Sequence, residues 1–354
     1  LLGDAARREQ LDLLPPQVRV LPRAGAMGFT AEEKWLDAKE REGKVTLSAA
    51  QTRVLDAAYH REFRRVFGAS QFDLACEFDG YSRFWARFVS ASASGRRIAY
   101  LHNNMLEERR SKHAELATVF PLYHGFDALL SVSSSVHDAN VEALAARFDV
   151  EHTKFAWANN VVDADRVRRG ALEPVDQAVA TFVRNAGRVL VAVGRLSVEK
   201  GHDRLIAQFA QVSRVGDQLI IVGGGPEEAH LRSTARRWGV ADRVLFTGQI
   251  LNPYPVMALA DAVLLLSRWE GQGLILLEAM ILGVPVVSTD IPGPRSVLND
   301  FGGVLVANTD QGVRDGLQAA LDGRLVVGTL DIERYNAEAV ERFRQVVRPA
   351  GRRA

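Results

Sequence analysis

Cysteine is almost absent from this sequence, since Cys76 is the only one among 354 residues. A single thiol cannot form an internal disulfide, and it cannot build a zinc site from cysteine ligands. The sequence is therefore typical of a reducing compartment, and we expect a cytoplasmic protein. Free cysteines usually behave as small apolar residues, so we expect Cys76 in a hydrophobic core.

Long apolar runs and excess charge are also missing. No segment approaches the roughly 18 apolar residues that a membrane-spanning helix needs. The chain carries 44 lysines and arginines against 43 aspartates and glutamates, so it has no overall attraction for nucleic acid. We expect at most peripheral contact with the inner face of a membrane. The candidate contacts are charged clusters at residues 61–65, 108–112, 166–169 and 348–353, although such clusters are more often solvated faces.

Lysine is scarce, with six lysines against 38 arginines. Arginine is thus the default cation of this chain, and a lysine within a glycine-rich turn is more informative than usual. Lys200 is such a lysine.

Short apolar runs alternate with amphipathic stretches through the second half of the chain. The runs begin about 20 to 30 residues apart, the length of a strand, a crossover helix and two loops. Residues 202–212 show the apolar spacing of such a helix. The pattern predicts a parallel sheet covered by helices on both faces. The expected strands are residues 189–193, 219–222, 244–247, 262–266, 284–288 and 304–306.

The first half repeats this pattern less regularly, with expected strands at residues 72–78, 98–101 and 128–132. We therefore predict an α/β fold of two doubly wound, Rossmann-like domains. Their expected extents are residues 1–165 and 166–331, and residues 332–354 form a C-terminal helix that can pack back on the first domain. Because the chain begins with Leu1 rather than methionine, we expect the first domain to be incomplete at its start.

Ligands of open α/β sheets bind beyond the carboxyl ends of the strands, so the loops there are the places to search. Arg195 and Lys200 lie between the strand at 189–193 and the next helix, in a turn bounded by Gly194 and Gly201. A guanidinium and an ammonium beside a helix N-terminus suit a diphosphate. A solvated turn with two surface cations is the alternative. The glycine spacing is not that of a Walker P-loop.

Two carboxylates follow the expected strand at residues 262–266. Glu270 lies in a glycine-rich loop, and Glu278 lies within the helix that we expect to begin near Leu274. Both carboxylates can then face one ligand and accept hydrogen bonds from its hydroxyl groups. The alternative is that Glu278 is a solvated helix residue. The glycines from Gly223 onward are a weaker signal, and they lack the dinucleotide pattern of nicotinamide enzymes.

Together these motifs resemble the retaining nucleotide-sugar glycosyltransferases of the GT-B fold, family 4. Five motifs occur in the family's order within about 100 residues. Together they identify the family far more specifically than any single motif does. They are the Arg195 and Lys200 turn, the glycines at 223–225, Gly248, the pair Glu270 and Glu278, and residues 283–287.

The resemblance implies roles for individual residues. Arg195 and Lys200 would bind the diphosphate of the donor, Glu270 the transferred sugar and Glu278 the ribose. Ile250 would lie beside the base. The remaining donor-binding positions are Gly194, Gly223, Gly271, Gln272, Gly273 and Leu274, of which residues 271–274 would contribute backbone contacts.

His102, at the end of an expected strand, corresponds to a histidine with which the family's first domain commonly reaches the donor sugar. A structural role at the strand end is the alternative. Residues 100–105, 122–127 and 131–133 are similar to members that decorate teichoic-acid-like or capsular polymers. Asn104 stands where those members carry an acidic residue.

Asp163 and Asp165 invite comparison with a metal-binding Asp-x-Asp motif. Their surroundings instead resemble the family's interdomain turn, in which an aspartate caps a helix. We therefore expect no metal and no other cofactor, because Arg195, Lys200 and a helix terminus can stabilise a leaving diphosphate.

The predicted function is transfer of a hexose-type sugar from a nucleoside diphosphate to an acceptor hydroxyl, with retention of configuration. The acceptor is a polymer, a lipid-linked glycan or a small molecule. The alternatives are a nucleotide-sugar-binding subunit without activity and a GT-B epimerase or phosphorylase. No lysine follows Lys200 to anchor pyridoxal phosphate, which counts against a phosphorylase.

Overall fold

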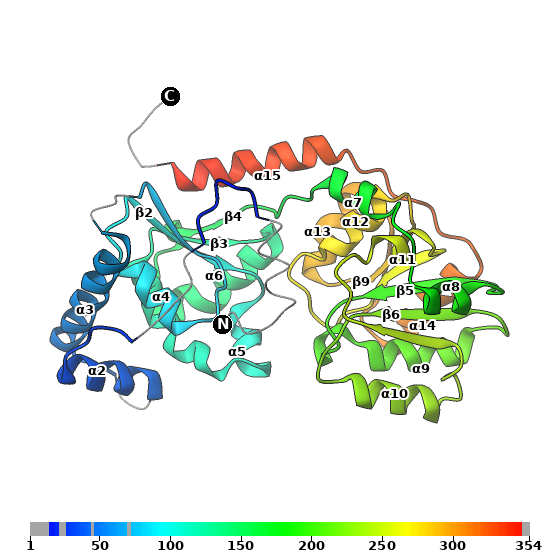
Figure 1. The fold of residues 1–354 in the computed structure, drawn as a ribbon, viewed down its shortest axis with the longest axis horizontal. Coiled ribbons are helices and arrows are strands. Elements are labelled where there is room, and N and C mark those ends of the chain that lie inside the picture. The colour runs from blue at the N-terminus through cyan, green and yellow to red at the C-terminus, as the bar shows by residue number, and fades with distance from the viewer. Residues whose placement is uncertain (1–13, 21–25, 44–45, 69–71, 349–354) are drawn as a thin grey trace. The chain divides into compact units, whose positions relative to one another are not determined.

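The computed structural model describes residues 14–20, 26–43, 46–68 and 72–348 (Figure 1). Two compact units divide the chain. One comprises Leu1–Ser70 with Ala91–Ala93, and the other comprises Gln71–Ser90 with Ser94–Ala354. Both β-sheets belong to the second unit, and the domain boundaries drawn from the sequence stay a prediction.

The first unit contains helices α2 (Ala31–Glu42) and α3 (Ala49–Phe67). Thr30 and Ser48 begin them with capping boxes, in which a side chain at each end of the first turn satisfies a free backbone N–H. The Tyr59 hydroxyl in α3 donates a hydrogen bond to Asp37 in α2 at 2.7 Å.

Four parallel strands form the smaller sheet, in the order β1-β2-β3-β4. Alternate residues face opposite sides. Ala99 and Leu129 pack with α4 and α6 on one side, while Ile98 and Leu130 pack with the C-terminal helix α15 on the other. The elements are β1 (Leu74–Glu77), α4 (Arg83–Ser90), β2 (Arg96–Leu101), α5 (Met105–Ser111), β3 (Ala128–Ser131), α6 (Ser134–Phe148) and β4 (Phe155–Trp157).

Cys76 is exposed, so the expectation that it lies in a core is wrong. It is paired in register with Ile98 and therefore faces the α15 side of the sheet. However, β1 is an edge strand, whereas α15 contacts β4 at the opposite edge.

Six parallel strands form the larger sheet, in the order β10-β9-β8-β5-β6-β7. The predicted doubly wound sheet is thereby confirmed. The fifth expected segment, residues 284–288, becomes a strand only from Val286, since Pro285 has no N–H for the ladder. The strands are β5 (Val189–Val193), β6 (Gln218–Val222), β7 (Val244–Gly248), β8 (Ala262–Leu265), β9 (Val286–Thr289) and β10 (Val304–Val306).

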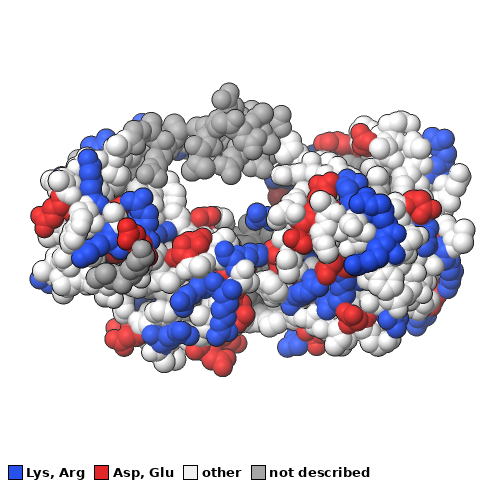
Figure 2. All heavy atoms as spheres, turned by 90° about the horizontal axis from the view of Figure 1, so that it is seen from below, with Lys and Arg blue, Asp and Glu red and all other residues white. Residues whose placement is uncertain are grey.

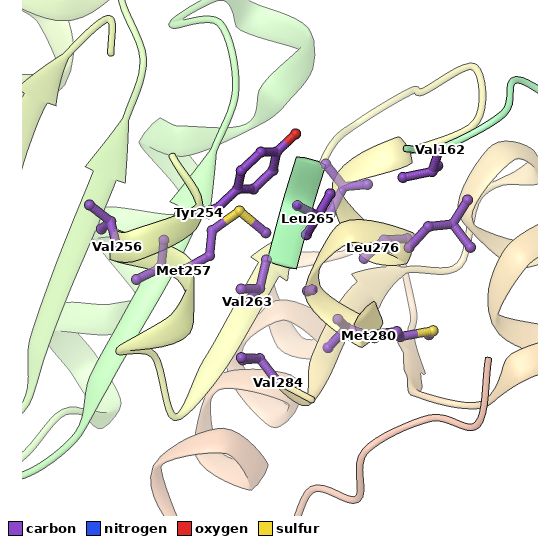
Figure 3. Packing of buried hydrophobic residues seen from close by; sticks show 14 of the residues in the cluster. Val162, Tyr254, Val256, Met257, Val263, Leu265, Leu276, Met280 and Val284 are labelled. Carbon is purple, nitrogen blue, oxygen red and sulfur yellow. The ribbon is translucent and has the colours of Figure 1, made fainter. Parts of the chain in front are cut away.

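Helices cover both faces of this sheet. Val263 packs with Met257 and Leu276 on one face (Figure 3), and Leu264 packs with Phe209 on the other. The helices are α7 (Ala164–Gly170), α8 (Gln177–Val183), α9 (His202–Val212), α10 (Glu228–Arg237), α11 (Tyr254–Ala258), α12 (Leu274–Ile281), α13 (Pro292–Phe301), α14 (Asp310–Leu321) and α15 (Ile332–Val347).

The strand order of the larger sheet determines where a ligand site can form. From β5 the chain proceeds outward through β6 and β7, then returns to β8 beside β5 and proceeds outward the other way. The loops after β5 and β8 therefore leave the same edge in opposite directions, which is the point where open α/β sheets form a ligand crevice.

Charges of both signs are distributed over the face of the molecule shown in Figure 2. Several arginines of the predicted clusters are paired, including Arg61 with Glu33 and Arg110 with Glu107. In the last cluster, residues 349–353 lie outside the described residues. Within the described ranges, no helix combines the length and apolar character needed to cross a membrane.

Removal of the Leu276 side chain should test the core beneath the β8 loop. Leu276→Ala is expected to destabilise the second unit by about 2 to 5 kcal/mol, because it leaves a cavity where the side chain is fully buried. Leu172→Ala is the matched control, since Leu172 is 86% exposed and should change stability by less than about 0.5 kcal/mol. Urea unfolding measures both, and equal midpoints would contradict the packing described here.

Candidate functional site

The loop after β5 carries the two predicted cations. Leu196 is fully buried and anchors the loop, while the Arg195 side chain is exposed. A short 3₁₀ turn, Val198–Lys200, leads through Gly201 into α9. Gly223, after β6, must be a glycine here, since a Cβ atom would lie 1.9 Å from the carbonyl oxygen of Gly194. The loops after β5 and β6 are thus in close backbone contact.

The loop after β8 contains Glu270 and places it beside Lys200. The Lys200 ammonium forms an ion pair with the Glu270 carboxylate. The Ser267 hydroxyl also donates to this carboxylate at 3.4 Å, and the Gly271 N–H donates to it at 3.3 Å. Glu270 is thereby held between the two loops that flank the crevice.

His102 lies at the end of β2, against the same loop. Its Nε2 atom is 2.5 Å from the carbonyl oxygen of Phe78, and its ring stacks on Tyr100. A Cβ atom at Gly271 would lie 2.0 Å from the carbonyl oxygen of His102, so only glycine allows this approach. The Ser133 hydroxyl donates to the Gly271 carbonyl oxygen at 3.2 Å.

Two pockets meet at Lys200, Glu270 and Asn103, which line both. The smaller pocket, of about 320 Å³, is also lined by His102 and by residues 271–275. The larger, of about 570 Å³, is also lined by Arg195. The structure thus brings together all four residues predicted to be catalytic.

Four of the predicted donor-binding residues are not among those that line these two pockets, namely Gly194, Gly223, Ile250 and Glu278. Glu278 accepts a hydrogen bond from the Tyr254 hydroxyl at 3.1 Å, and burial raises the pKa of its carboxyl group. Ile250 lines a separate pocket of about 390 Å³ beside α8. Gly194 and Gly223 are in close backbone contact with each other.

The Gln272 side chain is engaged in hydrogen bonds beside the smaller pocket, which both Gln272 and Asn160 line. It is 3% exposed and makes hydrogen bonds to Asn160 and Tyr335. Its side-chain amide is therefore occupied by partners within the protein.

The larger pocket contains charged residues to which the sequence assigned no role in the site. Lys112, just after α5, forms an ion pair with Glu199 in the β5 loop, to which the Ser197 hydroxyl also donates at 2.6 Å. Burial would raise the pKa of Glu199, but these two hydrogen bonds, a backbone hydrogen bond and the charge of Lys112 together lower it. Burial raises the pKa of Glu108 nearby. No local pattern joins Lys112 to Glu199, although Glu199 belongs to the Arg195 and Lys200 motif.

Asp163 caps α7, since its carboxylate accepts a hydrogen bond from the Arg166 N–H at 2.8 Å. Asp165 faces Arg168 at 3.7 Å. The interpretation of Asp163 as a helix cap is confirmed. Over the part of the chain that the structure describes, no three histidine, cysteine, aspartate or glutamate side chains are grouped to hold a metal ion.

This arrangement suits an anionic, hydroxyl-bearing ligand. Arg195 makes no ion pair among the described residues, so its guanidinium is available to an anion. Helix α12 begins after Gly273 without a described side-chain cap, which leaves N–H groups of its first turn for the ligand. Glu270 supplies a carboxylate acceptor for hydroxyl groups.

A comparison with known families agrees with this geometry. The family described as Glycosyl transferases group 1 matches residues 187–322. This segment begins just before β5 and ends just after α14, so it contains the complete larger sheet.

Characterised relatives match parts of the chain. N-acetyl-alpha-D-glucosaminyl L-malate synthase of Bacillus anthracis is 32% identical over 136 residues, which are 38% of this chain and 36% of the relative. The GDP-mannose-dependent alpha-(1-6)-phosphatidylinositol monomannoside mannosyltransferase of Mycobacterium tuberculosis is 35% identical over 162 residues, or 41% and 40%. The chain therefore spans well under two thirds of these relatives.

Solved structures extend the likeness to most of the chain. The crystal structure of Anabaena Alr3699/HepE in complex with UDP and glucose has a TM-score of 0.60 and 19% identity, and the match covers 85% of this chain and 83% of that protein. At this identity the likeness establishes the fold. The resemblance found in the motifs is thus confirmed for the fold, which is GT-B, and residues 187–322 match the glycosyl transferases group 1 family.

Proposed function

We propose that the chain transfers a sugar from a nucleoside diphosphate to an acceptor hydroxyl, with retention of configuration. The observation that carries this proposal is the convergence of Arg195, Lys200, Glu270 and His102 on two adjoining pockets. The names of two similar proteins support the class of donor, since one is described as GDP-mannose-dependent and one was crystallised with UDP.

Lys200 and Arg195 are suited to bind the diphosphate of the donor. Lys200 has three N–H donors, so it can keep its bond to Glu270 and still bind a phosphate oxygen. Arg195 adds a planar pair of donors. Charge grows on the diphosphate as its bond to the sugar breaks, and fixed cations stabilise that charge without reorganisation. The proposed reaction therefore uses no metal ion and no other cofactor.

The sugar would lie in the smaller pocket, between Glu270 and His102. In the proposed step the acceptor oxygen forms a bond to the anomeric carbon as the bond to the diphosphate breaks. A phosphate oxygen takes the hydroxyl proton, so both bonds lie on one face of the sugar and configuration is retained. Glu270 orients the sugar and stabilises positive charge on its ring.

The remaining assignments concern the rest of the donor, the acceptor and the location. We assign the ribose to Glu278 and the base to the loop at Ile250, which requires the donor to extend beyond the two pockets at Glu270. The larger pocket is the place for a polymeric, lipid-linked or small acceptor. The protein would act in the cytoplasm, with peripheral membrane contact where the acceptor is lipid-linked.

Loss of Arg195 should weaken binding of the nucleotide. Arg195→Ala is expected to raise the Kd of the preferred nucleoside diphosphate about 10- to 100-fold, because it removes charged hydrogen bonds to phosphate. Calorimetric titration with UDP, GDP and ADP measures this. Arg324→Ala is the matched control, since Arg324 is an exposed arginine paired with Asp322. An unchanged Kd in Arg195→Ala would contradict the assigned diphosphate site.

Loss of the Glu270 charge should separate binding from transfer. Glu270→Gln is expected to lower the transfer rate about 100- to 1000-fold, because it removes a charge that acts on the reacting sugar. Its Kd for the nucleoside diphosphate should stay within about threefold, since the cations remain. Glu228→Gln, which alters an exposed glutamate paired with Arg232, should leave transfer unchanged.

The transfer rates of the wild-type chain and of both variants are measured as product formation from nucleotide sugars. Undiminished transfer by Glu270→Gln would refute the role of Glu270. A wild-type chain that binds nucleotide sugars but transfers nothing would favour the non-catalytic subunit instead.

A further inference from the structure

Buried hydrogen bonds hold the Gln272 side chain from two directions. Its Oε1 atom accepts from the backbone N–H of Asn160 at 3.1 Å and from the Asn160 side-chain amide at 2.9 Å. Its Nε2 atom donates to the hydroxyl oxygen of Tyr335 in α15. The Tyr335 hydroxyl in turn donates to the Asn160 carbonyl oxygen at 3.1 Å. The three residues thus form a closed network, remote from one another in sequence.

This network is attached to the loop that carries Glu270. Gln272 lies between Gly271 and Gly273, and Gly273 has the left-handed φ of 79°. Glycine gives a backbone wide conformational freedom and supplies no side chain to restrain it. Gln272 therefore carries the one side chain within the loop between Glu270 and α12 that can anchor it, while the Ser133 hydroxyl holds the Gly271 carbonyl oxygen from outside the loop.

The start of α15 is held in place independently of the Tyr335 hydroxyl. Asn336 exchanges two hydrogen bonds with the backbone of Val162, at 2.9 and 2.8 Å. The Tyr335 ring packs edge-on against Phe301 at 5.8 Å. Further along the helix, Phe343 packs against the smaller sheet. Loss of the hydroxyl alone should therefore free the loop without releasing the helix.

We infer that Tyr335 and Asn160 are positioning residues that act through Gln272. They fix the loop of residues 270–273, and with it the Glu270 carboxylate and the first N–H groups of α12, in the geometry that sugar transfer requires. This inference rests on the proposed function for its effect on rate, whereas its effect on the loop does not depend on any ligand.

The kinetic test uses Tyr335→Phe in the full chain. We expect kcat for transfer to fall about tenfold, because small displacements of positioned groups cost rate steeply. The Kd of UDP or GDP should change less than about threefold, since Arg195 and Lys200 are untouched. Gln272→Met should show at least the same loss, because it also removes the two hydrogen bonds from Asn160. The double variant should be no worse than Gln272→Met alone, because both changes act through one network.

Tyr59→Phe is the matched control, since it removes another buried tyrosine hydrogen bond in the first unit. It should lower stability comparably and leave kcat unchanged. A loss of kcat that Tyr59→Phe shares, or no loss in Tyr335→Phe, would overturn the inference.

Hydrogen exchange tests the loop without any substrate. Backbone amides of residues 270–276 should exchange faster in Tyr335→Phe than in the wild-type chain or Tyr59→Phe. Unchanged exchange would overturn the inference whatever the kinetics show. If the wild-type chain neither binds nor uses nucleotide sugars, the proposed function fails, and hydrogen exchange still decides whether Tyr335 holds the loop.

Discussion

The ion pair between Lys200 and Glu270 joins the two loops on which the site depends. The two residues are far apart in the sequence, and they meet because β5 and β8 are neighbours in a parallel sheet. Parallel strands end at one edge, and at this edge the chain departs in opposite directions, so neither crossover covers the gap. The resulting crevice can place an ammonium, a guanidinium and a carboxylate within reach of one ligand.

Close backbone contacts bring the loops around this crevice together. Gly223 lets the β6 loop touch the β5 loop, and Gly271 lets the β8 loop touch His102. Each glycine lacks a side chain at a place where two main chains lie in close contact. These backbone contacts therefore fix the positions of the charged residues in the same loops. The second ion pair, between Lys112 and Glu199, adds a further connection from α5 to the same β5 loop. The site is therefore built by the larger sheet and completed by residues of the smaller one.

Much of this arrangement could be predicted from local patterns. The spacing of apolar runs predicted the six strands of the larger sheet, since buried parallel strands are apolar throughout and short. Their boundaries shifted where one residue imposed a limit, as Pro285 did for β9. Cys76 was misplaced because its burial depends on which edge of the smaller sheet α15 covers. The residues around Cys76 in the sequence do not indicate which edge of the sheet the helix α15 covers.

The sequence by itself determined the chemistry of this protein: which cations and carboxylates follow which strands, and where glycines permit the backbone to approach. These are properties of residue type and local spacing, and both act within a few residues. Only the tertiary structure decided that the Gln272 side chain bonds to Asn160 and Tyr335, that Lys112 meets Glu199, and that Glu278 lies with Tyr254. Such partners come from distant segments, and their pairing follows from how helices and sheets pack, which no local pattern encodes.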